Sequence, residues 1–495
     1  MTATQEPLDV EVERRPPAEY SFGFWVVICL AAFVGIFLAL TVDTALGLGA
    51  AVVVIAFAEI IRRPRDAVSL LTLVLALALL IPARLVFVPL GGSATPATLM
   101  GLLLLWYWLV ARLVPRLGLD FGRQPMRFAL LIWLWTLVAS VAAAYARAGI
   151  SPMEMSATNR GIVIYAAAAG IALIAADGIA SFVRLEALVQ VIVWLGSVVA
   201  LIGVVQFVLG IDLASYIHIP KLGSITTALS LGDREGFRRV GSTATHPIEY
   251  AAVLAALFPL ALHYGTFAAR RKIRWIPAIL IGMAIPGSLS RTAVVAFVVV
   301  LLFLAPTWSR QRRITALCVG IAGFAVVQVA YPGLTQTFIN LFTGAGQDIS
   351  VTTRTEDYGE AIPYILSSPW FGRGVRTFDP VTYFFVDNQY LIQLIETGIV
   401  GLIATVALLV TGVTLARGAR HRSTDPQTRD LGQAFAASIA ALMVCGATFD
   451  LLSFPMVTIL LFVLLGSSAA LWRIVCDEAA LRAGTLGQRP RGARR

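Results

Sequence analysis

Long apolar runs alternate with short polar segments along almost the whole chain. A helix that crosses the hydrocarbon core of a bilayer needs about 20 mainly apolar residues, and fourteen runs approach or exceed that length. The pattern therefore predicts an all-α polytopic integral membrane protein with about 12–14 transmembrane helices. The runs lie at about 22–40, 45–61, 67–81, 97–111, 128–146, 161–176, 187–209, 247–267, 275–289, 292–306, 314–331, 389–415, 432–449 and 453–472.

Composition agrees with this interpretation. Hydrophobic residues make up 58% of the chain and charged residues 13%, which excludes a soluble globular protein. The net charge of +10 is spread over many loops, so it indicates topology and contact with anionic lipid, and no nucleic-acid partner. The four cysteines are isolated, which predicts neither a disulfide framework nor a zinc site.

The distribution of basic residues predicts the orientation in the membrane. With the N-terminus in the cytoplasm, 27 of the 38 Lys and Arg residues fall on the inner side, as the positive-inside rule requires. Both termini are then cytoplasmic, and two long loops, 210–246 and 332–388, lie outside. The expected organisation is a disordered cytoplasmic segment 1–20, N-terminal transmembrane helices 21–209, a region 210–476 that contains the two outer loops, and a basic cytoplasmic tail 477–495.

Several arginines are expected on the outer side, where topology disfavours cations. Binding of an anion at the outer membrane face explains them, because guanidinium groups grip phosphate oxygens in a fork. The alternative is pairing with acidic residues of the same loops. These outer arginines are Arg234, Arg238, Arg239, Arg291, Arg354, Arg373 and Arg376.

The first polar cluster on the outer side spans residues 238–250. Pro247 suits the first position of a helix, which makes His246 its N-cap and Glu249 a first-turn acid. His246 and Glu249 have the spacing of a metal-binding pair, but a single pair without a second one predicts no metal site.

Two further clusters combine arginine with small or acidic residues. Ser290 and Arg291 open an apolar run, so Arg291 either anchors the helix at the membrane boundary or faces a lipid-linked phosphate. Arg354 is followed by Glu356 and Asp357, and then by the glycine-containing segment 371–376, whose glycines permit a sharp turn or close approach to a ligand.

The fourth cluster is AspAsnGlnTyrLeu at 387–391. Asp387 would cap the helix that starts here. Gln389, Gln393 and Glu396 fall on one face of that helix, and a polar face on a membrane helix points to a cavity or to the protein interior. The chain has no AspxAsp motif, Walker loop or nucleophile elbow, which argues against a cytoplasmic nucleotide as donor.

Together these clusters resemble the O-antigen ligase and polymerase superfamily of bacterial polysaccharide assembly. The matching features, over about residues 238–401, are Ser290-Arg291, Arg354, Pro369 to Gly374, Asp387 to Leu391 and Glu396 to Gly401. The resemblance implies a GT-C-like helical fold and a metal-independent, cofactor-free inverting glycosyltransferase in the bacterial inner membrane. Its donor would be a glycan on undecaprenyl pyrophosphate and its acceptor a sugar hydroxyl, with other polysaccharide-assembly proteins as further partners.

The resemblance also implies residue roles. Arg291, Arg354 and one of Arg238 or Arg239 would bind pyrophosphate, with Arg373 and Arg376 as second choices. The lipopolysaccharide ligases have a His where this chain has Asp387, so the general base would be Asp387, Glu249 or His246. Asn388, Tyr390 and Glu396 would contact the acceptor or support the structure. The alternative function is a flippase or other transporter of lipid-linked oligosaccharides, although the polar residues gather at one membrane face rather than near mid-membrane.

Overall fold

The computed structural model describes a subset of the chain. The described residues are 67–88, 94–113, 119, 122, 124–220, 222–224, 233–234, 237–269, 273–330, 333–343, 349–380 and 382–482. The predicted segment 1–20, the apolar runs at 22–40 and 45–61, and residues 483–495 of the predicted tail lie outside them.

The all-α fold class is confirmed, and each apolar run predicted within the described residues is helical. Eight of the described helices are long and apolar enough to cross a membrane, namely α4, α5, α6, α7, α8, α11, α14 and α16, and the others are shorter or more polar. The helices are α3 (Ala67–Leu79), α4 (Pro96–Leu113), α5 (Pro125–Ala146), α6 (Pro152–Gly178), α7 (Phe182–Leu209), α8 (Pro247–Phe267), α9 (Ile276–Ala284), α10 (Arg291–Leu304), α11 (Arg310–Ala330), α12 (Leu334–Thr343), α13 (Ile349–Ser367), α14 (Gln389–Arg422), α15 (Pro426–Gly446) and α16 (Pro455–Arg482). The last helix runs six residues into the tail that was predicted to be disordered from residue 477.

Helix starts follow the local sequence signals. Ser151 and Glu154 form a capping box at α6, which satisfies two backbone donors reciprocally. The predicted start of α8 is confirmed, with His246 as N-cap and Pro247 in the first turn. Gly210 ends α7 in the left-handed conformation (φ 72°) that glycine adopts without penalty.

Within the described residues, the two long segments predicted as outer loops contain secondary structure. The first contains the 3-10 turn Leu213–Tyr216 and short strands, of which β2 (Gly223–Ser224) pairs antiparallel with β1 (Leu85–Val86), and β3 (Asp233–Arg234) with β4 (Phe237–Arg238). The second holds α12 and α13. The segment 332–388 therefore contains two helices that the apolar pattern did not indicate, because helices too short or too polar to span a membrane give no long apolar run.

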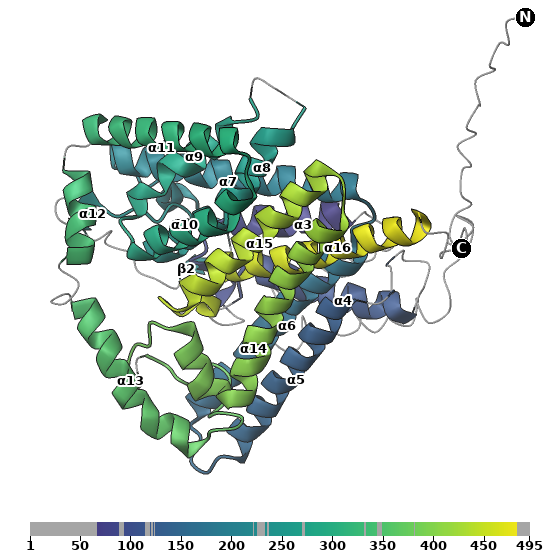
Figure 1. Cartoon of the computed structure of the whole chain (residues 1–495). Coiled ribbons are helices and arrows are strands. Elements are labelled where there is room, and N and C mark those ends of the chain that lie inside the picture. The colour runs from purple at the N-terminus through teal and green to yellow at the C-terminus, as the bar shows by residue number, and fades with distance from the viewer. Residues whose placement is uncertain are drawn as a thin grey trace, which may run out of the picture. The chain divides into compact units, whose positions relative to one another are not determined.

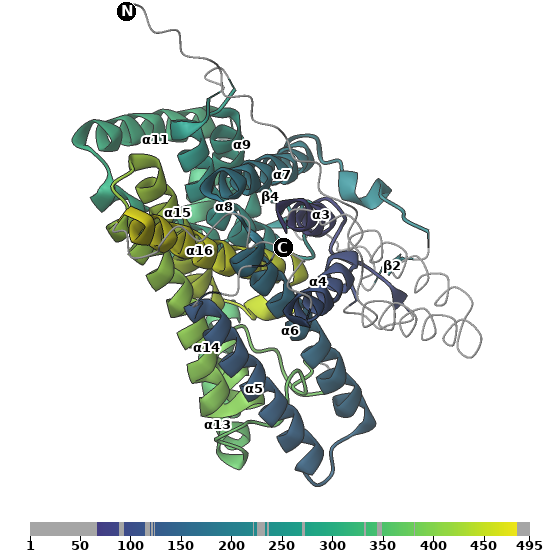
Figure 2. The same ribbon diagram turned by 90° about the vertical axis from the view of Figure 1, so that its right-hand side faces the viewer.

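The core forms where α16 packs against α6 and α14. In α16, 89% of the most apolar window is buried, compared with 0% in α11, so α16 lies inside the bundle. Small residues allow its close approach to α6: a Cβ on Gly466 would lie 2.4 Å from the Ala172 carbonyl oxygen. Figures 1 and 2 show α5, α6 and α14 running side by side from this core, and their far ends form the functional region described below.

Helix α14 is broken at Gly398, and residues 369–374 fill the break. Gly398 has φ 67° and ψ −171°, so the normal helical hydrogen bonds around it are lost. The segment 369–374 replaces them with four backbone hydrogen bonds of 2.9–3.2 Å, namely Arg373 N–H to Ile395 O, Gly374 N–H to Glu396 O, Ile399 N–H to Pro369 O, and Val400 N–H to Trp370 O. Backbone polar groups at membrane depth must be satisfied within the protein, which this insertion achieves.

Glycine is required on both sides of this contact. A Cβ on Gly372 would lie 2.2 Å from the carbonyl of Glu396, and a Cβ on Gly398 would lie 2.4 Å from the carbonyl of Trp370. Both residues also have positive φ. The glycines in the ProxxGlyxGly-like and GluxGly patterns therefore permit close backbone approach, as the sequence suggested for the first of them.

We expect Gly372→Ala to lower the thermal stability of the purified protein and its yield as a monodisperse species. Overpacking costs typically about 1–3 kcal/mol, and the left-handed backbone adds about 1–2 kcal/mol for a side chain. The same change at Gly359, in α13, is the matched control, because a Cβ there meets nothing within 4 Å. Equal thermal unfolding midpoints for the two variants would contradict the packing described here.

Candidate functional site

A cavity of about 540 Å³ opens at the end of the bundle where α6, α8 and α14 begin. Its walls come from the first turns of α6, the loop 376–387, the start of α14, and the segment 449–454 that joins α15 to α16. The ionisable residues that line it are Glu154, Arg160, His246, Arg376, Asp379, Asp387, Glu396 and Asp450.

The structure divides the predicted site residues into two groups. Four of them line the cavity: Asp387, His246, Arg376 and Glu396. The side chains of Glu249, Arg238, Arg239, Arg291, Arg373, Asn388 and Tyr390 are outside its lining. Arg354 belongs to the N-terminal part of α13, residues 349–356, of which only the backbone is described.

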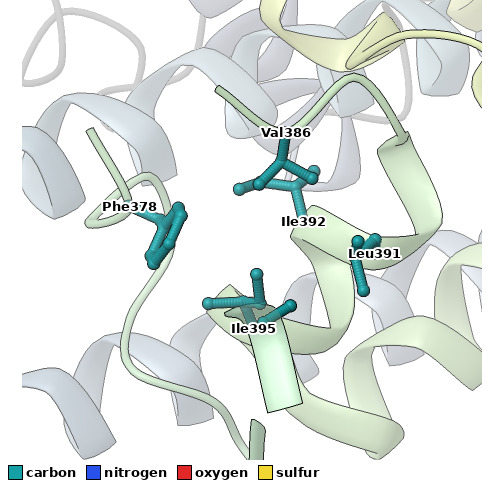
Figure 3. Close-up of a cluster of buried hydrophobic side chains, with 6 residues drawn as sticks. Phe378, Val386, Leu391, Ile392 and Ile395 are labelled. Atoms are coloured by element: carbon teal, nitrogen blue, oxygen red, sulfur yellow. The ribbon is translucent and has the colours of Figure 1, made fainter. Parts of the chain in front are cut away.

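A hydrophobic cluster holds the cavity loop against α14. Phe378 and Val386 from the loop pack on Leu391, Ile392 and Ile395 of the first turns of the helix, as Figure 3 shows. The rings of Phe378 and Tyr383 stack with centroids 4.5 Å apart, which joins the start of the loop to its middle. Aromatic and aliphatic packing therefore fixes a segment with little regular secondary structure.

Asp387 faces the cavity because its neighbour performs the capping. The sequence left capping as the alternative role of Asp387, but the side chain of Asn388 is the N-cap of α14 and accepts from Tyr390 N–H at 2.9 Å and Leu391 N–H at 3.2 Å. Tyr390 has a structural contact too, since its hydroxyl donates to Met443 O in α15 at 2.6 Å. Asp387 itself lines the cavity.

The predicted polar face of α14 points into the protein. Gln389, Gln393 and Glu396 are 4%, 1% and 6% exposed, as expected for a polar stripe on a membrane helix. Gln389 Oε1 accepts from Leu452 N–H at 2.6 Å, which ties α14 to the segment before α16. Glu396 accepts from Phe378 N–H at 3.3 Å and so holds the start of the cavity loop.

Arg376 is held in a strained conformation between acidic groups. Its φ of 56° is costly for a residue with a side chain. Its guanidinium donates to the Tyr165 hydroxyl, and burial, which lowers the pKa of Arg376, is outweighed by Tyr165, Asp450 and Glu396, which raise it. The other described non-glycine residues with positive φ are Ser242 and Leu289, so all three belong to or adjoin the clusters singled out in the sequence.

His246 is placed as a hydrogen-bond donor rather than a base. Its Nδ1 accepts from Ile248 N–H at 3.2 Å, so the proton of the neutral ring is on Nε2. Burial and the nearby Arg239 lower its pKa to about 4, although Asp387 opposes this shift. At neutral pH the ring is uncharged and has no free acceptor nitrogen.

Glu249 is sealed inside the protein and does not reach the cavity. It is 0% exposed, and its carboxylate accepts from Thr245 N–H at 2.8 Å and from the first backbone N–H groups of α16, with Met456 at 2.8 Å and Val457 at 3.3 Å. The carboxylate therefore joins the N-termini of α8 and α16, where helix dipoles favour a negative charge. This geometry matches the first-turn role that the sequence allowed and leaves no access for a substrate proton.

Arg373 belongs to a network behind the cavity wall. Its guanidinium donates to the Tyr383 hydroxyl at 2.7 Å, and Tyr383 in turn donates to Glu154 at 2.9 Å. Arg147 also pairs with Glu154, at 2.7 Å. Arg238 donates to Gly210 O at 2.6 Å, so it too has a structural contact.

The Ser290-Arg291 pair borders the site from a neighbouring helix. Thr292, one residue further on, shares a 2.9 Å hydrogen bond with Thr448, two residues before the cavity-lining Asp450. The segment before Ser290 is joined to the cluster 238–250 by a hydrogen bond, in which Val240 N–H donates to Gly287 O at 3.3 Å.

Sequence reasoning missed four charged residues of the cavity, namely Glu154, Arg160, Asp379 and Asp450. Arg160 lies in the third turn of α6, and within the part of the chain that the structure describes its guanidinium donates to Ser156 Oγ at 2.5 Å and meets no carboxylate. Burial and the nearby Asp387 raise the pKa of Asp450, while Ser453 and Arg376 oppose the rise. The sequence signal that could have indicated Arg160 and Asp450 is a charged residue at the outer end of an apolar run. The sequence analysis used such residues only to predict the topology.

The cavity lies beside the points in α6 and α14 at which a long stretch without charged residues begins. Arg160 is the last charged residue of α6 before Asp177, and Glu396 is the last of α14 before Arg417. The stretches between them, 161–176 and 397–416, are long enough to cross most or all of a hydrocarbon core of about 30 Å. The cavity is therefore at a membrane boundary.

A comparison with protein families tests the resemblance. Residues 276–406 match the family model described as O-antigen ligase. The resemblance read from the motifs is confirmed over this segment, which is called the O-antigen ligase domain below. A comparison with curated proteins finds no match.

The O-antigen ligase domain supplies only part of the cavity. The matched segment contains Arg376, Asp387 and Glu396, together with the break in α14. Arg160, His246 and Asp450 come from outside it. The family supports a role of this multi-pass membrane protein in polysaccharide ligation or polymerisation.

The depressed pKa of His246 predicts a pH dependence of stability. A histidine of ordinary pKa 6.5 that falls to about 4 in the folded state binds fewer protons when folded, so its contribution is present above pH 6.5 and is lost as pH falls toward 4. We expect His246→Asn, which keeps an N-cap acceptor but does not titrate, to have a shallower fall of the thermal unfolding midpoint over this range. Parallel midpoint curves for the two proteins would rule out the assignment.

Proposed function

We propose that the protein transfers a glycan from undecaprenyl pyrophosphate to a sugar hydroxyl at the outer face of the bacterial inner membrane, with both termini in the cytoplasm. The product would be a longer or ligated surface polysaccharide. The observation that carries this proposal is the position of Arg160 and Arg376 in a cavity at the start of the uncharged stretches of α6 and α14. An isoprenoid chain in the bilayer brings its phosphates to this level.

The reaction is a single displacement with inversion. The acceptor oxygen attacks the anomeric carbon and forms the new C–O bond, while the bond from that carbon to the pyrophosphate oxygen breaks. The leaving pyrophosphate keeps the electron pair, and the acceptor proton passes to a protein base. Arginines stabilise the charge that develops on the leaving group, and a positioned carboxylate accelerates the proton transfer by typically 10²–10⁴-fold.

We assign the base to Asp387. It lines the cavity, whereas Glu249 is enclosed and the Nδ1 of His246 is occupied by a backbone N–H. A second carboxylate, that of Asp450, lines the same cavity.

We assign the pyrophosphate to Arg160 and Arg376, with Arg239 near His246 as a further source of positive charge. The charge of Arg376 interacts with the carboxyl groups of Asp450 and Glu396. Arg160 is therefore the cavity arginine whose charge is least compensated by described residues. Arg291 and Arg354 retain their proposed pyrophosphate role from the resemblance. Arg373 and Arg238 serve instead to hold loops, given their contacts with Tyr383 and Gly210.

The test is glycan transfer in membranes supplied with a radiolabelled glycan on undecaprenyl pyrophosphate. We expect Asp387→Asn to lower the rate by roughly 10²-fold or more, as loss of a general base does. Arg160→Gln should lower it by about 10-fold or more, since it removes a charge-assisted contact worth about 1.5–3 kcal/mol.

Arg310→Gln is the matched control, because Arg310 is an exposed arginine at the start of α11 and is not among the cavity residues. Transfer that survives unchanged in both Asp387→Asn and Arg160→Gln would overturn the site. Movement of the labelled lipid across the bilayer without any transfer by the wild-type protein would favour a flippase. Products with longer glycan indicate a polymerase, and an unchanged glycan on a second molecule indicates a ligase.

A further inference from the structure

Helix α13 carries an apolar stripe that is more than half exposed among the described residues. Its members, Tyr358, Ile362 and Leu366, follow each other at intervals of four residues and are 52%, 52% and 71% exposed. Residues four apart lie on one face of a helix, so these three side chains share one face of α13. Trp370, three residues beyond the end of the helix, is 64% exposed.

The remaining faces of α13 differ in character. Ala361 and Tyr364 turn toward the cavity loop, where the Tyr364 ring meets Phe378 edge-on at 5.1 Å between centroids. Glu360 and Ser367 are exposed on the flank of the helix that is separated from Ile362 by the buried Ala361. The helix thus has a protein face, an apolar face and a polar edge, which is the pattern of a helix that lies in a membrane interface.

The stripe is continuous with the lipid-facing surface of α14. The carbonyls of Pro369 and Trp370 accept from Ile399 and Val400 N–H at 2.9 and 3.2 Å, which fixes the end of the stripe beside the start of the uncharged stretch of α14. Along that stretch Ile399 and Ile403 are exposed, the latter to 63%. Figure 1 shows α13 to one side of α14 and inclined to it.

We propose that α13 lies on the outer leaflet with Tyr358, Ile362, Leu366 and Trp370 in the lipid. Tyr358 at one end of the stripe and Trp370 beyond the other end suit this position, because both side chains are enriched at membrane–water interfaces. Through Tyr364 the helix supports Phe378, which lines the cavity. Attachment of α13 to lipid therefore sets the cavity wall at the height of the membrane surface.

The test measures contact of α13 with lipid directly and needs no substrate. Cys29, Cys318, Cys445 and Cys476 are replaced by Ala, and Leu366→Cys and Ser367→Cys are then introduced separately and labelled with bimane. The proteins are reconstituted in phosphatidylcholine–phosphatidylglycerol vesicles that contain lipid with a doxyl quencher near the headgroup. We expect the label at 366 to be quenched at least twofold more than the label at 367. Position 367 is on the same helix but on its polar edge.

Equal quenching at the two positions would overturn the proposal. Protection of residue 366 from the quencher that disappears on dilution of the protein in lipid would show that a second copy covers the stripe, and would overturn it as well. Size-exclusion profiles like that of the parent protein confirm that the labelled variants are folded. Because the readout is independent of glycan transfer, its result stands whether or not the proposed reaction is observed.

Discussion

The backbone contact between residues 369–374 and the break in α14 determines the geometry of the whole site. An unpaired N–H or C=O in a membrane costs several kcal/mol, so a helix interrupted at Gly398 is stable only if another segment supplies its hydrogen bonds. Pro369 to Gly374 does so with four bonds. The chain that leaves this contact then reaches Arg376, Phe378 and Asp387 in sequence, which places a charged loop against α6 and α14.

The same contact explains why the loop carries function without much regular structure. Gly161 in α6 has no side chain, and a Cβ there would lie 2.9 Å from Val375 and 3.1 Å from Arg376. Arg376 therefore packs against α6 at Gly161, where it meets Tyr165 and the cavity-lining residues Glu396 and Asp450. These surrounding contacts maintain the strained backbone of Arg376. Such strain is common at functional sites, where the orientation of a side chain matters.

Much of the fold could be predicted from the sequence, because long apolar runs and helix caps are local signals. The start of α8 at His246 and Pro247 and the inward polar face at Gln389, Gln393 and Glu396 were predicted in this way. Contacts between distant segments could not be. Asp387 and Asn388 are both good caps, and only the structure shows that Asn388 takes the role. Arg160 belongs to a helix far from the matched motifs, so its place in the cavity depends on the packing of α6 against the loop.

The resulting site is a cavity with charged lining residues beside the apolar stretches of α6 and α14. Arginines at the membrane boundary suit a lipid-borne pyrophosphate, and the carboxylates of Asp387 and Asp450 suit removal of a proton from an incoming hydroxyl. The most direct measurement is a cryo-electron microscopy structure of the protein in a lipid nanodisc with undecaprenyl pyrophosphate. The account predicts diphosphate density between Arg160 and Arg376, with the Asp387 carboxylate facing it across the cavity. Diphosphate density elsewhere, with this cavity filled only by solvent, would contradict it.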